Sequence, residues 1–184
     1  MTILRIDSSI TGDNSASRAL TDSIVEQLKA ANWGEQIVTR DLFAEPLPHL
    51  TLDAFADSSV LDEFLAADIV VVDAPMYNFT VPSQLKAWID RIVIAGRTFQ
   101  YGPSGPEGLA TGKRVIIALA RGGLYGEGSP IRASLEHVET YLRGVFNFIG
   151  IEPEFIIAEG VNVSPEQRES SLKGALIEVE RLAA

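Results

Sequence analysis

A loop that follows an apolar run carries unusual side chains for a surface segment. It reads APMYNFTVP, so that Met76, Tyr77, Asn78 and Phe79 stand between a strand-like run and a helical pattern. Because connecting loops mostly run over the surface, large apolar side chains in a loop need something to cover them. A flat, partly polar ligand would cover them, although burial in the protein core would also explain the apolar ones.

Two prolines bracket this loop and favour the ligand interpretation. Pro75 and Pro82 each fix their own backbone and restrict the residue before them. The amides between them are then presented to the edge of a ligand in a fixed geometry. The loop therefore predicts a cradle for a planar ligand with a polar edge, to which Asn78 adds a side-chain amide.

A serine-rich segment, DSSITGDNSASRAL, follows the first strand-like run. Ser15 and Ser17 stand where a helix is expected to begin, and Ser9 precedes them. Hydroxyls and free amides at a helix start bind phosphate, but the same residues also serve as ordinary helix caps. The segment contains neither GxGxxG nor GxxxxGK[ST]. It favours a phosphate group carried by something other than a Rossmann-bound dinucleotide.

A third loop, LARGGLYGEGSP, is rich in glycine beyond another apolar run. Gly122 and Gly123 permit the backbone to approach a planar ligand closely, although a simple mobile loop would have the same composition. The three loops together supply a phosphate grip, an apolar cradle with aligned amides and a thin wall. FMN matches this set, because it has a terminal phosphate, a ribityl chain and a flat ring with a polar edge.

The elements that position these loops follow from the hydrophobic pattern. Strand-like runs occur at residues 2–6, 36–40, 68–75, 113–120 and 154–160. Helical stripes lie between them at residues 20–31, 85–93 and 135–149, and a fourth stripe at residues 172–182 follows the last run. This alternation predicts a parallel sheet covered by helices on both faces, here as a single domain over residues 1–184. Ligands of such sheets bind beyond the carboxyl ends of the strands, where all three loops lie.

Composition narrows the function classes. The 15 basic and 25 acidic residues give a net charge of −10, which disfavours nucleic acid and anionic membranes as partners. There is no cysteine, so redox chemistry would have to come from a cofactor, and the only histidines, His49 and His137, form no metal-binding pair. No apolar segment is long enough to span a bilayer, and we expect a cytoplasmic protein.

Four segments resemble one enzyme family over nearly the whole chain. They read APMYNFTVPSQLKAWIDRI, GPEGL…GK, ARGGLY and YLRGVFNFIGI…AEG. They are similar to the FMN-dependent NADH-azoreductases, also called FMN-dependent NADH:quinone oxidoreductases. The resemblance implies a flavodoxin-like, doubly wound five-stranded parallel sheet with helices on both faces. It also implies a homodimer with active sites at the subunit interface.

The resemblance assigns roles to individual residues. The implied cofactor-binding residues are Ser9, Ser15, Ala16, Ser17, Pro75, Met76, Tyr77, Asn78, Phe79, Ala120, Arg121, Gly122 and Gly123. Ala120 stands where the family has serine, and residues 41 to 66 form a shorter segment than in the family. Tyr77, Phe79 and Tyr125 are expected to border the substrate cavity, and Arg121 or a backbone amide to stabilise negative charge on the ring.

The implied reaction is hydride transfer from NADH or NADPH to FMN, followed by transfer of two electrons to a quinone or an azo compound in a ping-pong cycle. No side chain needs to act as a nucleophile. A flavodoxin-like electron carrier without NADH activity is the alternative, since acidity suits docking on basic partners. Asp7 and Asp73 after strand-like runs admit a third reading, a receiver-like signalling domain. The cradle and the excursion over residues 98–114 favour an enzyme.

Overall fold

The computed structural model describes residues 1–34 and 36–182 and contains a five-stranded parallel sheet in the order β2-β1-β3-β6-β7. The strands are β1 (Thr2–Asp7), β2 (Gln36–Asp41), β3 (Ile69–Pro75), β6 (Arg114–Arg121) and β7 (Glu154–Glu159). Each overlaps one of the predicted runs. The order reverses between β1 and β3, as in flavodoxin-like sheets, so the predicted fold class is confirmed.

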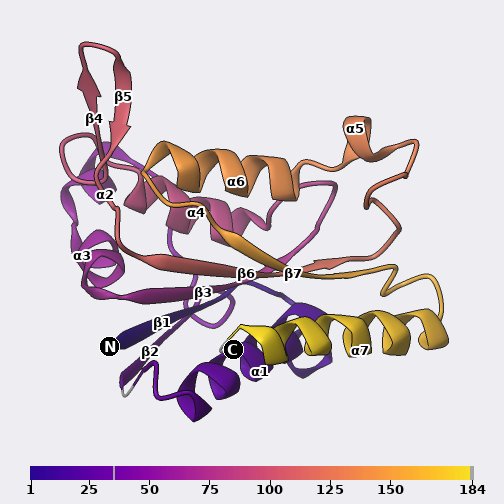
Figure 1. Cartoon of the computed structure of the whole chain (residues 1–184). Coiled ribbons are helices and arrows are strands. Elements are labelled where there is room, and N and C mark those ends of the chain that lie inside the picture. Colours follow the sequence, from indigo (N-terminus) through magenta and orange to yellow (C-terminus); the bar gives the residue numbers. More distant parts are fainter. Residues whose placement is uncertain (35, 183–184) are drawn as a thin grey trace.

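Helices cover both faces of the sheet (Figure 1). One face carries α1 (Ala16–Ala30) and α7 (Pro165–Arg181), and the other carries α3 (Ser59–Ala66), α4 (Ser83–Ile92) and α6 (Val138–Phe148). Three short helices lie in connections, namely η1 (Gly12–Asn14), α2 (Leu52–Ala56) and α5 (Arg132–Leu135). In the described part of the chain, none of these helices has both the length and the apolar character needed to cross a bilayer.

Alternation along the strands divides the core into two layers. Ile3 and Val71 pack with α1 and α7, whereas Leu4 and Val72 pack with the helices of the other face. All of β3 is buried because both its faces are covered and it lies between β1 and β6. This coverage of both faces explains why the sequence of β3 is a continuous apolar run.

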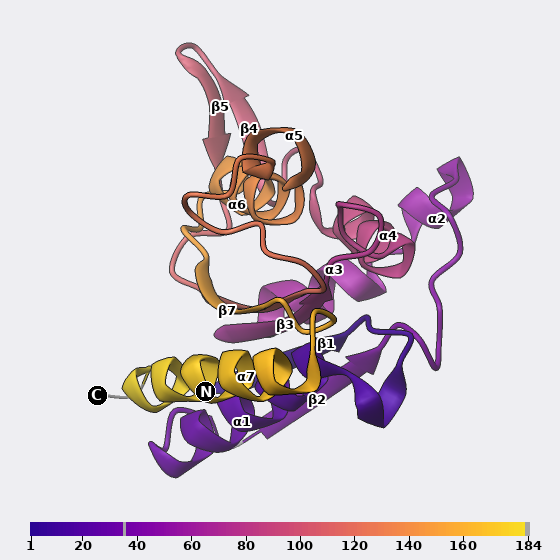
Figure 2. The same cartoon turned by 90° about the vertical axis from the view of Figure 1, so that its right-hand side faces the viewer.

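The excursion over residues 98–114 contains a β-hairpin rather than part of the main sheet. Its strands, β4 (Phe99–Gly102) and β5 (Gly105–Gly108), pair antiparallel and project beyond the helices (Figures 1 and 2). Phe99 anchors the base, with its ring 4.6 Å from that of Phe148 at the end of α6. Tyr101, further along, is exposed.

The loops after β1, β3, β6 and β7 gather at the edge that Figure 2 turns toward the viewer. Backbone hydrogen bonds join them beyond the regular ladder. The Met76 amide donates to the Ala120 carbonyl at 2.8 Å, and the Gly160 amide donates to the Gly123 carbonyl at 2.9 Å. These bonds fix the relative positions of three loops that lie far apart in sequence.

Phe64 tests the packing of the α3–α4 layer. Its ring is fully buried and meets Trp88 edge to face, with 5.9 Å between ring centroids. We expect Phe64→Ala to lower the free energy of unfolding by about 3–5 kcal/mol, because it leaves a cavity in a packed core. Phe43→Ala, at a side chain that is 47% exposed, should cost less than about 1 kcal/mol in the same urea titrations. Equal losses for the two variants would contradict this packing.

Candidate functional site

A small cavity of about 160 Å³ opens among the loops at the carboxyl edge of the sheet. We call it the serine cavity. Its lining residues are Ser9, Thr11, Asn14, Ser15, Ala16, Ser17, Pro75, Met76, Tyr77, Ala120, Gly122, Val161, Asn162 and Arg168. The structure thus brings together most of the residues predicted to bind a cofactor, from the loops after β1, β3 and β6.

The start of α1 supplies the polar wall of the serine cavity. Ser15 is the N-cap residue, and its Oγ accepts from the Arg18 amide at 3.1 Å. The same oxygen lies 3.1 Å from Ser17 Oγ. The amides of Ala16 and Ser17 begin the helix, where an amide has no intrahelical carbonyl partner and the helix dipole is positive. Ser15 therefore caps the helix and also faces the cavity, so the two readings of this serine are compatible.

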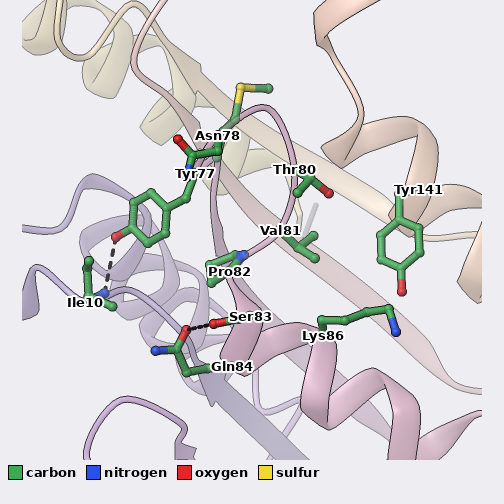
Figure 3. A pocket seen from close by; sticks show the side chains of 11 residues that line it. Ile10, Tyr77, Asn78, Thr80, Val81, Pro82, Ser83, Gln84, Lys86 and Tyr141 are labelled. Atoms are coloured by element: carbon green, nitrogen blue, oxygen red, sulfur yellow. Dashed lines mark hydrogen bonds between the residues drawn. The ribbon is translucent and has the colours of Figure 1, made fainter. Parts of the chain in front are cut away.

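A buried carboxylate holds the loop after β1 in place. Asp73, at 0% exposure in β3, accepts from the amides of Ser8 at 2.9 Å and Ser9 at 2.8 Å. Burial raises the pKa of Asp73, although the hydrogen bonds from Ser17 and these amides oppose the shift. Ser9 is thereby fixed with its Oγ 3.1 Å from the Tyr77 hydroxyl, which also accepts from the Ile10 amide at 3.2 Å (Figure 3).

A larger cavity of about 870 Å³ lies beside the serine cavity, and we call it the loop cavity. Its lining residues are Ile10, Met76, Tyr77, Asn78, Thr80, Val81, Pro82, Ser83, Gln84, Lys86 and Tyr141 (Figure 3). Lys86 from α4 and Tyr141 from α6 stand on its far side from Tyr77. Met76 and Tyr77 line both cavities, so the two spaces adjoin through the loop after β3.

The tip of this loop is a tight turn with a strained backbone. Tyr77 and Thr80 exchange two backbone hydrogen bonds, at 3.0 and 3.1 Å, and both residues between them have positive φ, 48° at Asn78 and 71° at Phe79. Asparagine tolerates this conformation, but a phenylalanine there is costly, and such strain gathers at functional sites. The Phe79 carbonyl accepts from the His137 amide at 3.1 Å, which fastens the turn to the start of α6.

The glycine loop after β6 lies close to its neighbours. A Cβ on Gly122 would come within 2.8 Å of Asn162 Nδ2, and a Cβ on Gly123 within 3.0 Å of the Tyr125 ring. Tyr125 meets Phe79 edge to face at 6.4 Å. Gly122 lines the serine cavity, whereas Gly123, Phe79 and Tyr125 are not among the lining residues of either cavity.

Arg121 points elsewhere than expected. Its side chain is 1% exposed and pairs with Glu139 at 2.7 Å, Glu136 at 3.2 Å and Glu159 at 3.6 Å. Burial opposes ionisation of Glu139, but the hydrogen bond and charge of Arg121 outweigh it and lower the pKa of that carboxyl. The guanidinium ties the end of β6 to α6 and β7. Its charge is already balanced there, which argues against the predicted role of stabilising charge on a ring.

Five lining residues of the serine cavity were not singled out as binding residues by the sequence: Thr11, Asn14, Val161, Asn162 and Arg168. Three of them follow β7. The rule that ligands bind beyond the carboxyl ends of parallel strands applies to this loop as well, and would have flagged it. Arg168 lies on α7 itself, and only the packing of that helix against α1 shows where it reaches.

Residues 1–183 match a family model described as "Flavodoxin-like fold". The chain belongs to this flavodoxin-like family. It is 53% identical, over an alignment 194 positions long, to FMN-dependent NADH:quinone oxidoreductase 2 of Bradyrhizobium diazoefficiens, and the alignment covers 96% of each chain. The predicted family resemblance is therefore confirmed.

Solved structures of the flavodoxin-like family agree with this placement. An azoreductase from Bacillus anthracis superposes with a TM-score of 0.89 at 30% identity, over 100% of this chain and 98% of that one. An FMN-dependent NADH-azoreductase from the same species, in complex with FMN, gives 0.84 at 26% identity over 100% and 99%.

The raised pKa of Asp73 predicts an unusual pH dependence. Because the folded state protonates this carboxyl above its ordinary pKa of 3.8, the cost of the buried charge is relieved as pH falls. Between about pH 7 and pH 4, wild type should therefore gain stability relative to Asp73→Asn. Urea titrations of both proteins across that range measure the difference.

Asp41→Asn is the matched control. The hydrogen bond from Arg18 lowers the pKa of Asp41, so the stability that this carboxylate contributes is lost as pH falls. Wild type should thus keep its advantage over Asp41→Asn down to about pH 4 and lose it only below the ordinary pKa of 3.8, so the titrations of this pair extend to about pH 2. This direction is opposite to that of the Asp73→Asn comparison. The same sign of change in both comparisons would contradict the assignment of a destabilised carboxylate to Asp73.

Proposed function

We propose that this chain is an FMN-dependent oxidoreductase that oxidises NADH or NADPH and reduces a quinone or an aromatic azo compound. The observation that carries the proposal is the junction, through Met76 and Tyr77, of a small cavity at a serine-bearing helix start with a much larger cavity. FMN has the same two-part character. The names of the relatives, an NADH:quinone oxidoreductase and an NADH-azoreductase, support the reaction class.

The serine cavity fits the phosphate end of FMN. Ser9, Ser15 and Ser17 offer hydroxyls, and the free amides at the start of α1 offer donors where the helix dipole favours an anion. Two of these hydroxyls, on Ser15 and Ser17, are 3.1 Å apart. They can both donate to one phosphate group while Ser15 Oγ continues to accept from the helix.

The loop after β3 fits the ring. Pro75 ends β3 and the turn at Asn78 and Phe79 holds its backbone rigidly, so amides of this loop can meet the polar edge of the ring in a fixed geometry. Ala120 and Gly122 line the serine cavity together with Met76 and Tyr77 of this loop. Ala120 lacks the family's serine hydroxyl, but its carbonyl is occupied by the Met76 amide, so Ala120 remains tied to the loop.

When bound, FMN supplies the hydride and electron transfer. The residues of this chain position the reactants and exclude water, and none acts as a nucleophile. Phe79 and Tyr125 are in edge-to-face contact but line neither cavity, so the predicted role of these two side chains at the substrate requires a change of their position on binding. The loop cavity is wide, and we propose that a second copy of the chain encloses it in a homodimer. Donor and acceptor use this one space in turn, which gives ping-pong kinetics.

The test of this function is anaerobic mixing of the FMN-loaded protein with NADH alone, followed by visible absorption. An enzyme of this class should lose its yellow colour without any partner protein, and added quinone should restore it. A protein that stays oxidised with both NADH and NADPH would instead be an electron carrier. A purified protein that binds no flavin at all would contradict both readings.

The variant Ser15→Asp distinguishes the role of Ser15 as a helix cap from its proposed role in binding phosphate. Aspartate caps helices as well as serine does, so the fold should be retained. Its carboxylate would replace a donor with a negative charge at the serine cavity, and we expect FMN binding to weaken by about tenfold or more. Riboflavin, which lacks the phosphate, should be affected much less. Fluorescence titrations measure the affinities for FMN and for riboflavin. An equal loss of affinity for the two flavins would mean that the phosphate binds elsewhere.

A further inference from the structure

The charges around the serine cavity are unevenly placed. Among its described lining residues, Arg168 is the one with a charged side chain. Two buried carboxylates, Asp7 and Asp73, lie at the ends of β1 and β3. Arg18 is nearby, but its guanidinium makes hydrogen bonds of 2.8 and 2.9 Å to Asp41 and one of 3.1 Å to the Ser9 carbonyl. Its charge is therefore engaged outside the cavity.

Arg168 reaches the cavity from α7. It lies in the first turns of α7, which Ser164 caps, and its Nη2 donates to the Asn14 carbonyl at 2.8 Å. No carboxylate in residues 1–34 or 36–182 lies within ion-pair distance of it. A guanidinium has five N–H donors, so the bond to Asn14 leaves others for a ligand.

We propose that Arg168 is a cationic ligand for the phosphate of FMN, and that it makes the site prefer FMN over unphosphorylated flavin. The inference rests on the proposed function, because it assigns a residue to the same cofactor. A phosphate monoester carries a charge of about −1.5 to −2 at pH 7, whereas a helix N-terminus offers only about half a positive charge. Arg168 supplies the further positive charge that serines and amides cannot.

The competing reading is a structural tether. In that case Arg168 only holds Asn14, and with it η1, against α7. Losing the tether would disturb the whole cavity and would weaken every flavin alike. Losing a phosphate ligand would weaken FMN selectively, and the effect would depend on salt because the attraction is electrostatic.

The experiment titrates the apoprotein with FMN and with riboflavin, using flavin fluorescence, for wild type, Arg168→Gln, Arg168→Lys and Lys173→Gln. Lys173 is an exposed cation on the same helix and controls for net charge. We expect Arg168→Gln to weaken FMN by about 10- to 100-fold and riboflavin by less than about 3-fold. The FMN affinity of Arg168→Lys should lie between those of wild type and Arg168→Gln, and the FMN affinity of Lys173→Gln should equal that of wild type.

Raising the salt to about 1 M should shrink the difference between wild type and Arg168→Gln for FMN. Equal losses for both flavins, or full FMN affinity in Arg168→Gln, would overturn the role of Arg168 while leaving the proposed function in place. Absence of FMN binding by wild type would overturn both. Circular dichroism of each variant confirms that the fold is intact.

Discussion

The carboxylate of Asp73 joins the two strands on which the whole site depends. It lies in β3 and accepts the amides of Ser8 and Ser9 at the end of β1. The strand order of the sheet reverses between these two strands, which is where ligands of doubly wound sheets bind. Ser9, the start of α1 and the loop through Tyr77 all take their positions from this junction. Burying the charge of Asp73 lowers the stability of the fold, but its hydrogen bonds to Ser8 and Ser9 hold the two strand ends in place.

Local charge, not net charge, decides what this edge can bind. The chain has a net charge of −10, yet the serine cavity combines hydroxyls, free amides, a helix dipole and Arg168. Other arginines near the edge are engaged with carboxylates, Arg18 with Asp41 and Arg121 with Glu139. These pairs brace the loops, and Arg168 is the one charged side chain among the described lining residues of the serine cavity. An acidic protein can thus hold an anionic cofactor.

The fold was predictable because its central strands, β3 and β6, are buried on both faces. Continuous apolar runs such as that of β3 need both sheet faces covered, and the alternation with helices follows. Ser15 and Ser17 were also predictable, since a helix start has a recognisable residue pattern. Arg121 was not, because its three carboxylate partners come from α6, β7 and the connection before α6. Arg168 and the positive φ of Phe79 likewise depend on packing between segments distant in sequence.

A crystal structure of the protein grown with FMN tests the central claim most directly. The account predicts density for the phosphate between the start of α1 and Arg168, in contact with Ser9, Ser15 or Ser17. It predicts the ring against Met76 and Tyr77, beside the loop cavity. A flavin bound with its phosphate away from the serine cavity, or a serine cavity that stays free of flavin at saturating FMN, would contradict the account.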